Sequence, residues 1–441
     1  MTDILPIVSK AVFLGALVWG CDGGSQQADA GGDASTADAG SDVDNGAPST
    51  SYPAPHPPLP QLVNASKGPV LTSPKVYLVF YPGYAEEAQL QAMAQKMTTS
   101  TYWSAVVSEY GVGALSYGGT IDLTSQTPPA SITQADLQTW VGSEIQSGAF
   151  GTPDPQAIYT IVFPSTTTIS QPNPVSALFG TVDSCKAFTG YHDNVGVAVG
   201  DGGTTDFAYA VIPTCGPLST VTSTISHEWV EAATDPQVTS GGTFTLTGGP
   251  NAAFYGPDGD HAVWALLGGG EAADLCEPEG SSIDITPTDL AARVQRSWSN
   301  AAAAASHDPC VPGISGAFFD SAPVLGETVT FTSAFTGTVT TKGVTIAQGE
   351  SKTIEVDLFS DGDTGGPWTV SADDVLSTYY GSYGLKPTLS FSWDRTQGQN
   401  GEKLHLTITV TGASPVGAAH AFMITSKLSG RVAVWPGLVV E

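Results

Sequence analysis

Apolar residues follow two different spacings between about residues 70 and 305, and these spacings alternate along the chain. Nearly continuous apolar runs predict buried strands, and apolar residues three and four apart predict helices. The strand-like runs are KVYLVF (75–80), AIYTIVF (157–163) and DFAYAVIP (206–213), and the helix-like runs are EEAQLQAMAQKM (86–97) and ADLQTWVGSEIQS (135–147). Residues 289–305 are expected to form a closing helix. The interleaving predicts an α+β domain with a mixed sheet over residues 61–310.

After about residue 311 the apolar positions change to a period of two. TVTFTS (328–333), SKTIEVDLFS (351–360) and LHLTITVTG (404–412) alternate apolar and polar residues and are separated by turn residues. Short alternating strands of this kind are typical of an all-β sandwich. We therefore expect a C-terminal β-sandwich domain over residues 311–441. A binding role is expected for it, since its sequence contains no catalytic constellation.

Residues 22–60 lack apolar periodicity. DGGSQQADAGGDASTADAGSDVDNGAP (22–48) has a single valine and no aromatic residue, and the chain continues into the proline-rich YPAPHPPLP (52–60). Such a composition buries too little apolar surface to offset the entropy lost on ordering. We predict a disordered tether over residues 21–60.

The N-terminal apolar run AVFLGALVWG (11–20) ends in a small residue directly before Cys21. The run is too short to span a bilayer as a helix, so residues 1–20 are expected to be a signal peptide. Its arrangement resembles a bacterial lipoprotein signal, in which the chain is cut before a cysteine that receives lipid. Cys21 is then the lipidation site, and the membrane is contacted only through this lipid anchor. A plain secretory peptide is the alternative.

Charge narrows the range of partners. The 441 residues include 42 acidic and 14 basic side chains, for a formal net charge of −28. So acidic a chain repels phosphate backbones and anionic headgroups, which disfavours nucleic acid and an electrostatic membrane surface as partners. We expect an exported protein, either a lipoprotein of the bacterial cell envelope or an extracellular protein.

Four further cysteines favour two disulfides. They are Cys185, Cys215, Cys276 and Cys310. An even number of cysteines in an exported chain is typical of a disulfide framework, and the sequence leaves three pairings open. A tetrathiolate zinc site is the alternative, but no two of these cysteines form the C-x-x-C pair that is common in such sites.

The segment LSTVTSTISHEWVEAATDP (218–236) carries the candidate chemistry. Its apolar residues recur at helical spacing, and Pro236 ends the helix because proline cannot continue it. His227 and Glu231 are four residues apart, so their side chains project from one face and can reach a common point. Glu228 lies about 100° around the helix from His227, beside whatever that pair holds.

This arrangement follows the logic of H-E-x-x-H metallohydrolases, in which two helical side chains bind zinc and the intervening glutamate accepts a proton from water. Glu231 stands in the place of the second histidine, and a carboxylate is also a zinc ligand. We predict His227 and Glu231 as metal ligands, Glu228 as the catalytic base and one divalent metal as cofactor. Zinc is the expected metal, with manganese and calcium as alternatives. An ordinary exposed helix face bearing His and Glu is the alternative to a metal site.

A third ligand is expected from GGGEAADLCEP (268–278). Glu271 and Asp274 are three residues apart, and in one helical turn both carboxylates face the same way. We predict Glu271 as the third ligand and Asp274 as its substitute or as a hydrogen-bond partner of a ligand. The other ring N–H of a ligating histidine usually meets a carboxylate, a role open to Asp235 or Asp274. For His192 a structural role near a disulfide is preferred over that of a fourth ligand or substrate contact.

Several segments in the same order resemble one protein family. HEWVEAATDP (227–236) followed by EAADLC (271–276) resembles the H-E-x-x-E-(A/L)-x-(T/S)-(N/D)-P and E-(I/A)-x-D-x-C segments of the phosphate-induced, Exordium-like proteins and their bacterial relatives. The supporting segments are FTGYHDN (188–194), FAYAVIPTC (207–215) and VQRSWSNAA (294–302). The resemblance covers about residues 70–310.

The resemblance implies an extracellular protein with a zincin-like motif, from a family that is associated in plants with cell-wall growth responses. The motif residues that it carries over are His227, Glu228, Glu231, Asp235, Glu271 and Asp274. The Gly-rich TSGGTFTLTGGPNAAFYGPDGDH (239–261) departs from the family pattern as an insertion between the two motif segments.

The sequence therefore predicts a zincin-like α+β domain whose active-site helix binds one divalent metal, followed by a β-sandwich. The expected activity is that of an exported metal-dependent hydrolase, a zinc metallopeptidase acting on a peptide or a cell-surface polymer. The alternative is a non-catalytic binding protein of the cell envelope or matrix, in which the same helix is structural or holds a metal only for folding.

Overall fold

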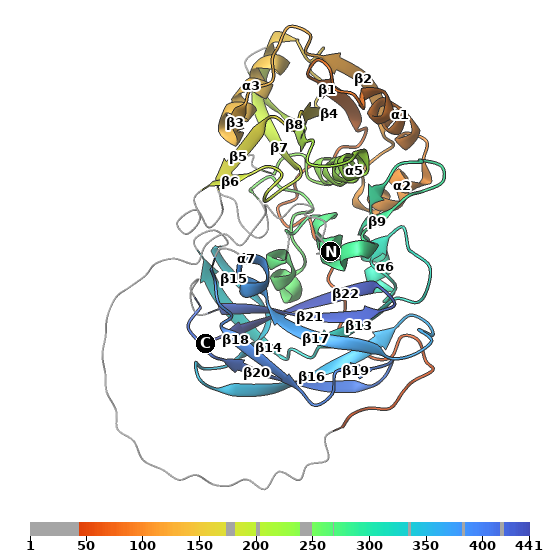
Figure 1. Ribbon diagram of the computed structural model, residues 1–441, viewed down its shortest axis with the longest axis vertical. Coiled ribbons are helices and arrows are strands. Elements are labelled where there is room, and N and C mark those ends of the chain that lie inside the picture. The colour runs from red at the N-terminus through yellow and green to blue at the C-terminus, as the bar shows by residue number, and fades with distance from the viewer. Residues whose placement is uncertain are drawn as a thin grey trace, which may run out of the picture.

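Two parts of the chain are distinct in Figure 1, one with helices around a sheet and one built mainly of strands. The computed structural model describes residues 44–172, 181–199, 203–238, 249–267, 269–333, 337–381, 384–414 and 419–441. Helices combined with mixed sheets fit the predicted α+β class, and the strand-rich part lies where the sandwich was expected. The predicted signal peptide, residues 21–43 of the predicted tether and the predicted lipidation site Cys21 lie outside the described residues.

A five-stranded sheet forms the centre of the N-terminal part, in the strand order β2-β1-β4-β8-β7. The strands are β1 (Lys75–Phe80), β2 (Ser116–Asp122), β4 (Ala157–Phe163), β7 (Tyr191–Val199) and β8 (Gly203–Pro213). β7 at the edge pairs antiparallel with β8, and the other neighbours are parallel, so the sheet is mixed. Every residue of β4 is buried, which explains its continuous apolar run.

Helices cover both faces of this sheet. They are α1 (Glu87–Met97), α2 (Thr101–Val107), α3 (Gln134–Ser147) and α5 (Leu218–Thr234), and a short turn η1 (Ser108–Tyr110) follows α2. Leu78 and Ile158 belong to the core shared with α1, α2 and α5, whereas Val79 and Ile161 belong to the core shared with α3. Successive strand residues point to opposite faces, so the alternation along β1 and β4 supplies both cores.

Shorter elements complete the N-terminal part. They are the small sheet of β3 (Ser131–Thr133), β5 (Thr168–Pro172) and β6 (Thr181–Asp183), the turns η2 (Gly259–Leu266) and η3 (Asp274–Ser282), the strand pairs β9 (Asp284–Ile285) with β10 (Val294–Gln295) and β11 (Ser297–Trp298) with β12 (Cys310–Val311), and the helix α6 (Asn300–Ala304).

The predicted closing helix over residues 289–305 is wrong for most of its length. Only the alanine-rich end is helical, because the residues before it pair as strands.

The C-terminal part contains two sheets. One has the order β13-β16-β20-β18 and the other β14-β15-β22-β21-β17-β19. The strands are β13 (Phe319–Pro323), β14 (Glu327–Ser333), β15 (Gly337–Thr345), β16 (Ser351–Ser360), β17 (Trp368–Asp374), β18 (Leu389–Trp393), β19 (Gln397–Gly398), β20 (Lys403–Val410), β21 (Ala419–Leu428) and β22 (Arg431–Val440), and α7 (Val375–Tyr380) follows β17. Leu358 and Leu406 of the first sheet share a buried core with Trp368 and Phe422 of the second. All neighbouring strands are antiparallel except β15 and β22.

The prediction of a disordered tether up to residue 60 is wrong for residues 44–60, which pack against the C-terminal part. The backbone N–H of Ala54 donates to Asn400 Oδ1 at 3.0 Å, and Asn400 Nδ2 donates to the Ser49 carbonyl at 2.9 Å. The His56 ring stacks on Phe359 with 3.5 Å between centroids. An aromatic ring and specific backbone hydrogen bonds therefore order a segment that its composition alone does not.

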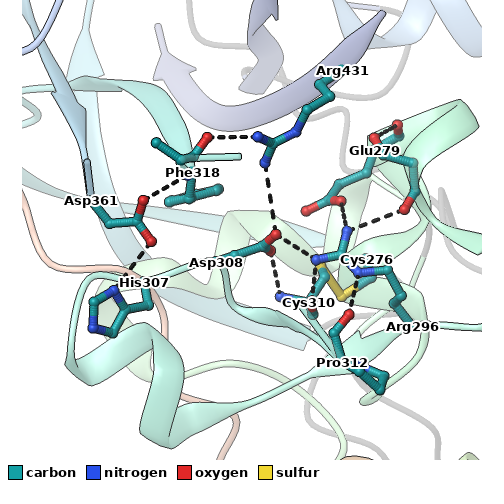
Figure 2. Close-up of polar contacts among 12 residues, drawn as sticks. Cys276, Glu279, Arg296, His307, Asp308, Cys310, Pro312, Phe318, Asp361 and Arg431 are labelled. Atoms are coloured by element: carbon teal, nitrogen blue, oxygen red, sulfur yellow. Dashed lines mark hydrogen bonds and ion pairs between the residues drawn. A yellow bond between two sulfur atoms is a disulfide. The ribbon is translucent and has the colours of Figure 1, made fainter. Parts of the chain in front are cut away.

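Arg296 joins several segments where the two parts meet (Figure 2). Its fully buried guanidinium donates from Nη1 to Glu279 Oε2 at 2.7 Å and from Nη2 to Asp308 Oδ2 at 2.5 Å. Nε donates to the Pro312 carbonyl at 3.0 Å, and Arg431 of β22 lies 3.9 Å from Asp308. This network links η3 to the beginning and the end of the sandwich.

The structure contains two disulfides, Cys185–Cys215 and Cys276–Cys310. They confirm the expectation of disulfides, fix one of the three pairings and fit an oxidising, extracellular environment. Among the described residues, no helix has both the length and the hydropathy needed to cross a membrane.

Candidate metal centre

Helix α5 places the motif residues inside the protein. Every residue from Val221 to Thr234 is buried, so the motif does not lie on an exposed helix face. Trp229 Nε1 donates to Thr160 Oγ1 of β4 at 2.7 Å, which fixes the helix against the central sheet. The helix ends at Thr234, and Asp235 has non-helical φ of −140° and ψ of 73° before Pro236, as predicted.

His227, Glu231 and Asp274 form the first group of possible metal ligands, which we call the His227 position. His227 Nε2 lies 2.9 Å from Glu231 Oε2 and 3.6 Å from Asp274 Oδ1. Ligand atoms about 2.0–2.2 Å from a tetrahedral ion are about 3.3–3.6 Å from one another. The backbone N–H of Asp274 also donates to Glu231 Oε1 at 3.0 Å, so the group is held together without an ion. The separation of His227 Nε2 from Asp274 Oδ1 falls in this range, whereas the separation of His227 Nε2 from Glu231 Oε2 is the shorter one of a hydrogen bond.

Asp274 takes the place that was predicted for Glu271. The predicted helical turn exists, since the N–H of Leu275 donates to the Glu271 carbonyl at 3.2 Å. However, η3 begins at Asp274, so Glu271 precedes its first residue and its side chain is not held on the same face. Glu271 Oε1 instead lies 3.2 Å from His192 Nε2.

His192 stands in a second group with Glu228 and Glu231, which we call the His192 position. Its Nδ1 atom lies 3.5 Å from Glu228 Oε2 and 3.6 Å from Glu231 Oε2. A structural role near a disulfide was predicted for His192. The structure instead places its ring next to the carboxylates of Glu228 and Glu231. Local spacing gave no signal for this contact, because it depends on the pairing of His192 with Ala210, a residue of the sheet face that α5 covers.

Asp235 does not make the contact predicted for it. Its Oδ1 accepts a hydrogen bond from the backbone N–H of Ala253 at 2.8 Å, and burial raises its carboxyl pKa to about 6. The carboxylate beyond His227 is instead Glu277, whose Oε1 lies 3.8 Å from His227 Nδ1. Glu277 was not among the predicted site residues, although it lies three residues after Asp274.

Five carboxylates surround the two imidazoles, three from the two groups and two from the neighbouring Glu271 and Glu277. The carboxylates belong to Glu228, Glu231, Glu271, Asp274 and Glu277, and the ion pairs found for them among the described residues are all with His192 and His227. With all five carboxylates ionised, an excess of negative charge would remain even with both imidazoles protonated. An uncompensated buried charge costs several kcal/mol, so this cluster favours a cation.

The pKa values of these side chains are shifted by burial and by the neighbouring charges. Burial raises the pKa of the Asp274 carboxyl well above its usual range, and the neighbouring Glu231 adds to the increase. Burial acts in the same direction on Glu231, but His227 and His192 outweigh it and lower the pKa to about 2. Burial opposes the charged form of His227, yet Glu231 and Glu228 raise its pKa well above the usual range.

Several buried atoms of the cluster have no hydrogen-bond partner within the part of the chain that the structure describes. They are His192 Nε2, His227 Nδ1, Glu228 Oε1, Glu271 Oε1 and Glu277 Oε1. His192 Nε2 faces Glu271 Oε1 at 3.2 Å and His227 Nδ1 faces Glu277 Oε1 at 3.8 Å as ion pairs, so Glu228 Oε1 is the atom of this set that has no facing partner among the described residues. Buried polar atoms are normally paired, so this oxygen leaves room for a further ligand such as a metal ion. Nitrogen and carboxylate oxygen are both donors that zinc accepts.

Two glycines make room for these carboxylates. A Cβ atom at Gly190 would lie 2.8 Å from Glu228 Oε1 and 2.4 Å from Thr224 Cγ2, so only glycine lets the start of β7 approach α5 this closely. A Cβ at Gly269 would lie 1.8 Å from Asp274 Oδ2, and its φ of +141° is one that glycine adopts readily. Both positions keep the ligand side chains tightly enclosed.

A third acidic group, Glu279 with Asp308 and Cys310, is of a different kind. Arg296 lies between its carboxylates, as Figure 2 shows, and Cys310 is bonded to Cys276. A guanidinium already compensates the charge there, so this group does not compete as a metal centre.

Comparison with known proteins adds no functional information. No family model matches the chain, and no curated protein matches it. Similar solved structures include the titin M3 domain, with 12% identity, a TM-score of 0.15 and coverage of 22% of this chain and 85% of that one. Domains 1–6 of the surface layer protein SbsC show 15% identity and a TM-score of 0.16, over 28% of this chain and 20% of that chain.

Proposed function

We propose that the chain is an exported, metal-dependent hydrolase of the metallopeptidase class, with zinc at the His227 position. The observation that carries the proposal is the convergence of His227, Glu231 and Asp274, whose ligand atoms lie within 4.8 Å of one another, with Glu228 one helical position away. Glu277 next to the other ring nitrogen of His227 supports it, because an outer carboxylate orients a ligating imidazole.

Glu228 is the residue that we propose as proton acceptor. A zinc ion at this position supplies Lewis acidity, which lowers the pKa of water and polarises a carbonyl group. Burial raises the pKa of the Glu228 carboxyl, while His227 and His192 act against that increase. A carboxylate beside the His227 position is placed to accept a proton at one step and return it at the next.

The wider proposals follow from the sequence. We propose membership in the Exordium-like family over about residues 70–310, a zincin-like fold and a lipid anchor at Cys21. The proposed substrate is a peptide or a cell-surface polymer, because an exported enzyme without a nucleic-acid-binding charge meets such chains outside the cytoplasm.

Replacing Glu228 by glutamine tests the catalytic part of the proposal. We expect Glu228→Gln to lower turnover at least about 100-fold, because the amide cannot accept the proton, while zinc at the His227 position is retained. Cleavage of a broad peptide library, with the metal content of the same preparation, measures both. Loss of the His227-position zinc together with activity would contradict the role of Glu228, and unchanged turnover would do so as well.

The burial of the cluster favours a second candidate function. His192 is the most exposed of the ligands in the two positions at 8%, and the others are exposed by 3% or less. A metal in such a setting can serve to hold α5, β7 and η3 together in a non-catalytic envelope or matrix protein. Bound zinc with no cleavage across the peptide library, in the wild type as in Glu228→Gln, would favour this candidate.

A further inference from the structure

We infer that His192, Glu228 and Glu231 form a second divalent-cation position, which shares Glu231 with the His227 position. This inference rests on the proposed metal centre and adds regulation to it. When the second ion binds, the Glu228 carboxylate becomes its ligand and is no longer free to accept a proton. Excess divalent metal is therefore expected to inhibit the proposed hydrolase.

The spacing of the donor atoms is the first argument. His192 Nδ1 lies 3.5 Å from Glu228 Oε2 and 3.6 Å from Glu231 Oε2. Both distances agree with the separation of about 3.3–3.6 Å between ligand atoms of a tetrahedral zinc ion. The three side chains come from α5 and from β7, which lie next to each other in the fold.

The unpaired, buried Oε1 atom of Glu228 is the second argument. Glu228 Oε1 makes no hydrogen bond to any described part of the chain, and Glu228 is 1% exposed. Glu228 directs its other oxygen at His192. A buried carboxylate with one free oxygen and an imidazole at ligand distance is the arrangement that a metal ion satisfies.

The two positions are built in the same way. Each has one imidazole with Glu231 and a further carboxylate, and each imidazole has an outer carboxylate near its remaining nitrogen. Glu277 lies 3.8 Å from His227 Nδ1, and Glu271 lies 3.2 Å from His192 Nε2. Such outer carboxylates orient metal-ligating histidines. Glu271, predicted as a ligand at the His227 position, is thus placed to support His192.

Shared ligation by Glu231 and the charge balance are the third argument. Glu231 Oε2 is near both imidazoles, at 2.9 Å from His227 Nε2 and 3.6 Å from His192 Nδ1. A carboxylate between two ions about 3.5–4 Å apart is a recurring feature of two-metal sites. With the five carboxylates ionised, one divalent ion would leave most of their negative charge in place, and a second would offset more of it.

Zinc titration of the metal-free full chain tests the inference. Calorimetric titration with zinc chloride should show two equivalents for the wild type and one for His192→Asn. His307→Asn, which changes an exposed histidine, is the matched control and should keep both. Near-UV circular dichroism checks that each variant is folded, and Glu228→Gln provides a second variant that should lose only the second equivalent.

The outcomes separate this inference from the proposed function. A wild type that binds one zinc, kept in His192→Asn and lost in His227→Asn, overturns the second position and leaves the proposed metal centre standing. Two equivalents that persist in both His192→Asn and Glu228→Gln also overturn it, since the second ion then lies elsewhere on this acidic chain. A wild type that binds no zinc overturns both proposals.

Discussion

Asp320 is a buried residue of β13 in the C-terminal part, and its burial changes the pKa of its carboxyl group. It is 2% exposed, and its Oδ1 accepts hydrogen bonds from the Ser321 N–H at 2.7 Å and from Ser426 Oγ at 3.2 Å. Burial raises its pKa to about 7, although these two hydrogen bonds act to lower it. The ionised form is therefore disfavoured in the folded protein up to about neutral pH.

Asp320→Asn should change how stability depends on pH. The folded protein holds this proton more tightly than the unfolded chain, whose Asp pKa is about 3.9, so the wild type loses stability as pH rises from about 4 to about 7. Asparagine can accept the same hydrogen bonds and does not titrate. The free energy of unfolding of the variant should therefore rise relative to wild type across this window, by up to about 1.4 kcal/mol per pH unit.

Urea unfolding at several pH values measures this difference. Asp373→Asn serves as the control, because Asp373 is an exposed residue of β17 in the same region. A difference between Asp320→Asn and wild type that stays constant from pH 4 to pH 7 would contradict the prediction.

The ligands that could be predicted are those fixed by local geometry. His227 and Glu231 share a helix face at a spacing of four, and Asp274 was foreseen as a substitute ligand because it lies close in sequence to Glu271. The contacts of His192 were not predictable in this way, since they depend on the pairing of β7 with β8 and on the packing of that sheet face against α5. Strand register and packing are non-local, and no motif spacing encodes them.

The segment η3 connects the candidate metal centre with the rest of the molecule. It contains Asp274 and Glu277, and Cys276 between them is bonded to Cys310 of β12. The two cysteines are 34 residues apart in sequence, so the bond closes a long loop. It thereby restricts where the segment that carries Asp274 can move.

Replacing Cys276 and Cys310 together by serine should lower the free energy of unfolding by about 3–4 kcal/mol, because the unfolded chain regains the entropy of that loop. Zinc affinity at the His227 position should fall as well, since Asp274 is then less well placed. Denaturant unfolding and zinc titration measure the two effects.

The second disulfide provides the matched control. Cys185–Cys215 closes a loop of similar length, since its cysteines are 30 residues apart in sequence, but it does not include η3. The corresponding double serine variant should lose similar stability and keep Asp274 in place. Wild-type zinc affinity in the variant of Cys276 and Cys310 would show that η3 does not depend on this bond.

Elements with strong local patterns were predictable, and elements that depend on distant partners were not. α5 ends before Pro236 as expected, because proline acts on its own neighbours. The predicted helix over residues 289–305 is shortened to α6, which Ser299 caps by accepting from the Ala302 N–H at 3.1 Å. Val294 and Gln295 pair with Ile285 and Asp284, and these tertiary pairings outweigh local propensity.

The two parts of the molecule share one hydrophobic core. Trp264 of η2 packs against Trp435 of β22 with 5.4 Å between ring centroids, and against Trp298 at 5.5 Å. The core that contains Val230 of α5 also includes Phe331 and Trp435 of the sandwich strands. The arginine network in Figure 2 crosses the same junction. The sandwich therefore supports the segment that carries Asp274, although its sequence shows no catalytic residues.

The candidate metal centre is where this architecture converges. His192, His227 and Asp274 come from β7, α5 and η3, and the chain has a formal net charge of −28. Five carboxylates around two imidazoles in the interior form a site that a cation stabilises. That the folded chain holds a divalent metal at this point is the claim on which the proposed function depends.

Elemental analysis of the purified full chain tests this claim most directly. We expect at least one equivalent of a divalent metal, zinc in our proposal, with the ion at the His227 position lost in His227→Asn and the full content kept in His307→Asn. A wild-type protein that is folded and contains no stoichiometric metal, or a metal content that His227→Asn leaves unchanged, would contradict it.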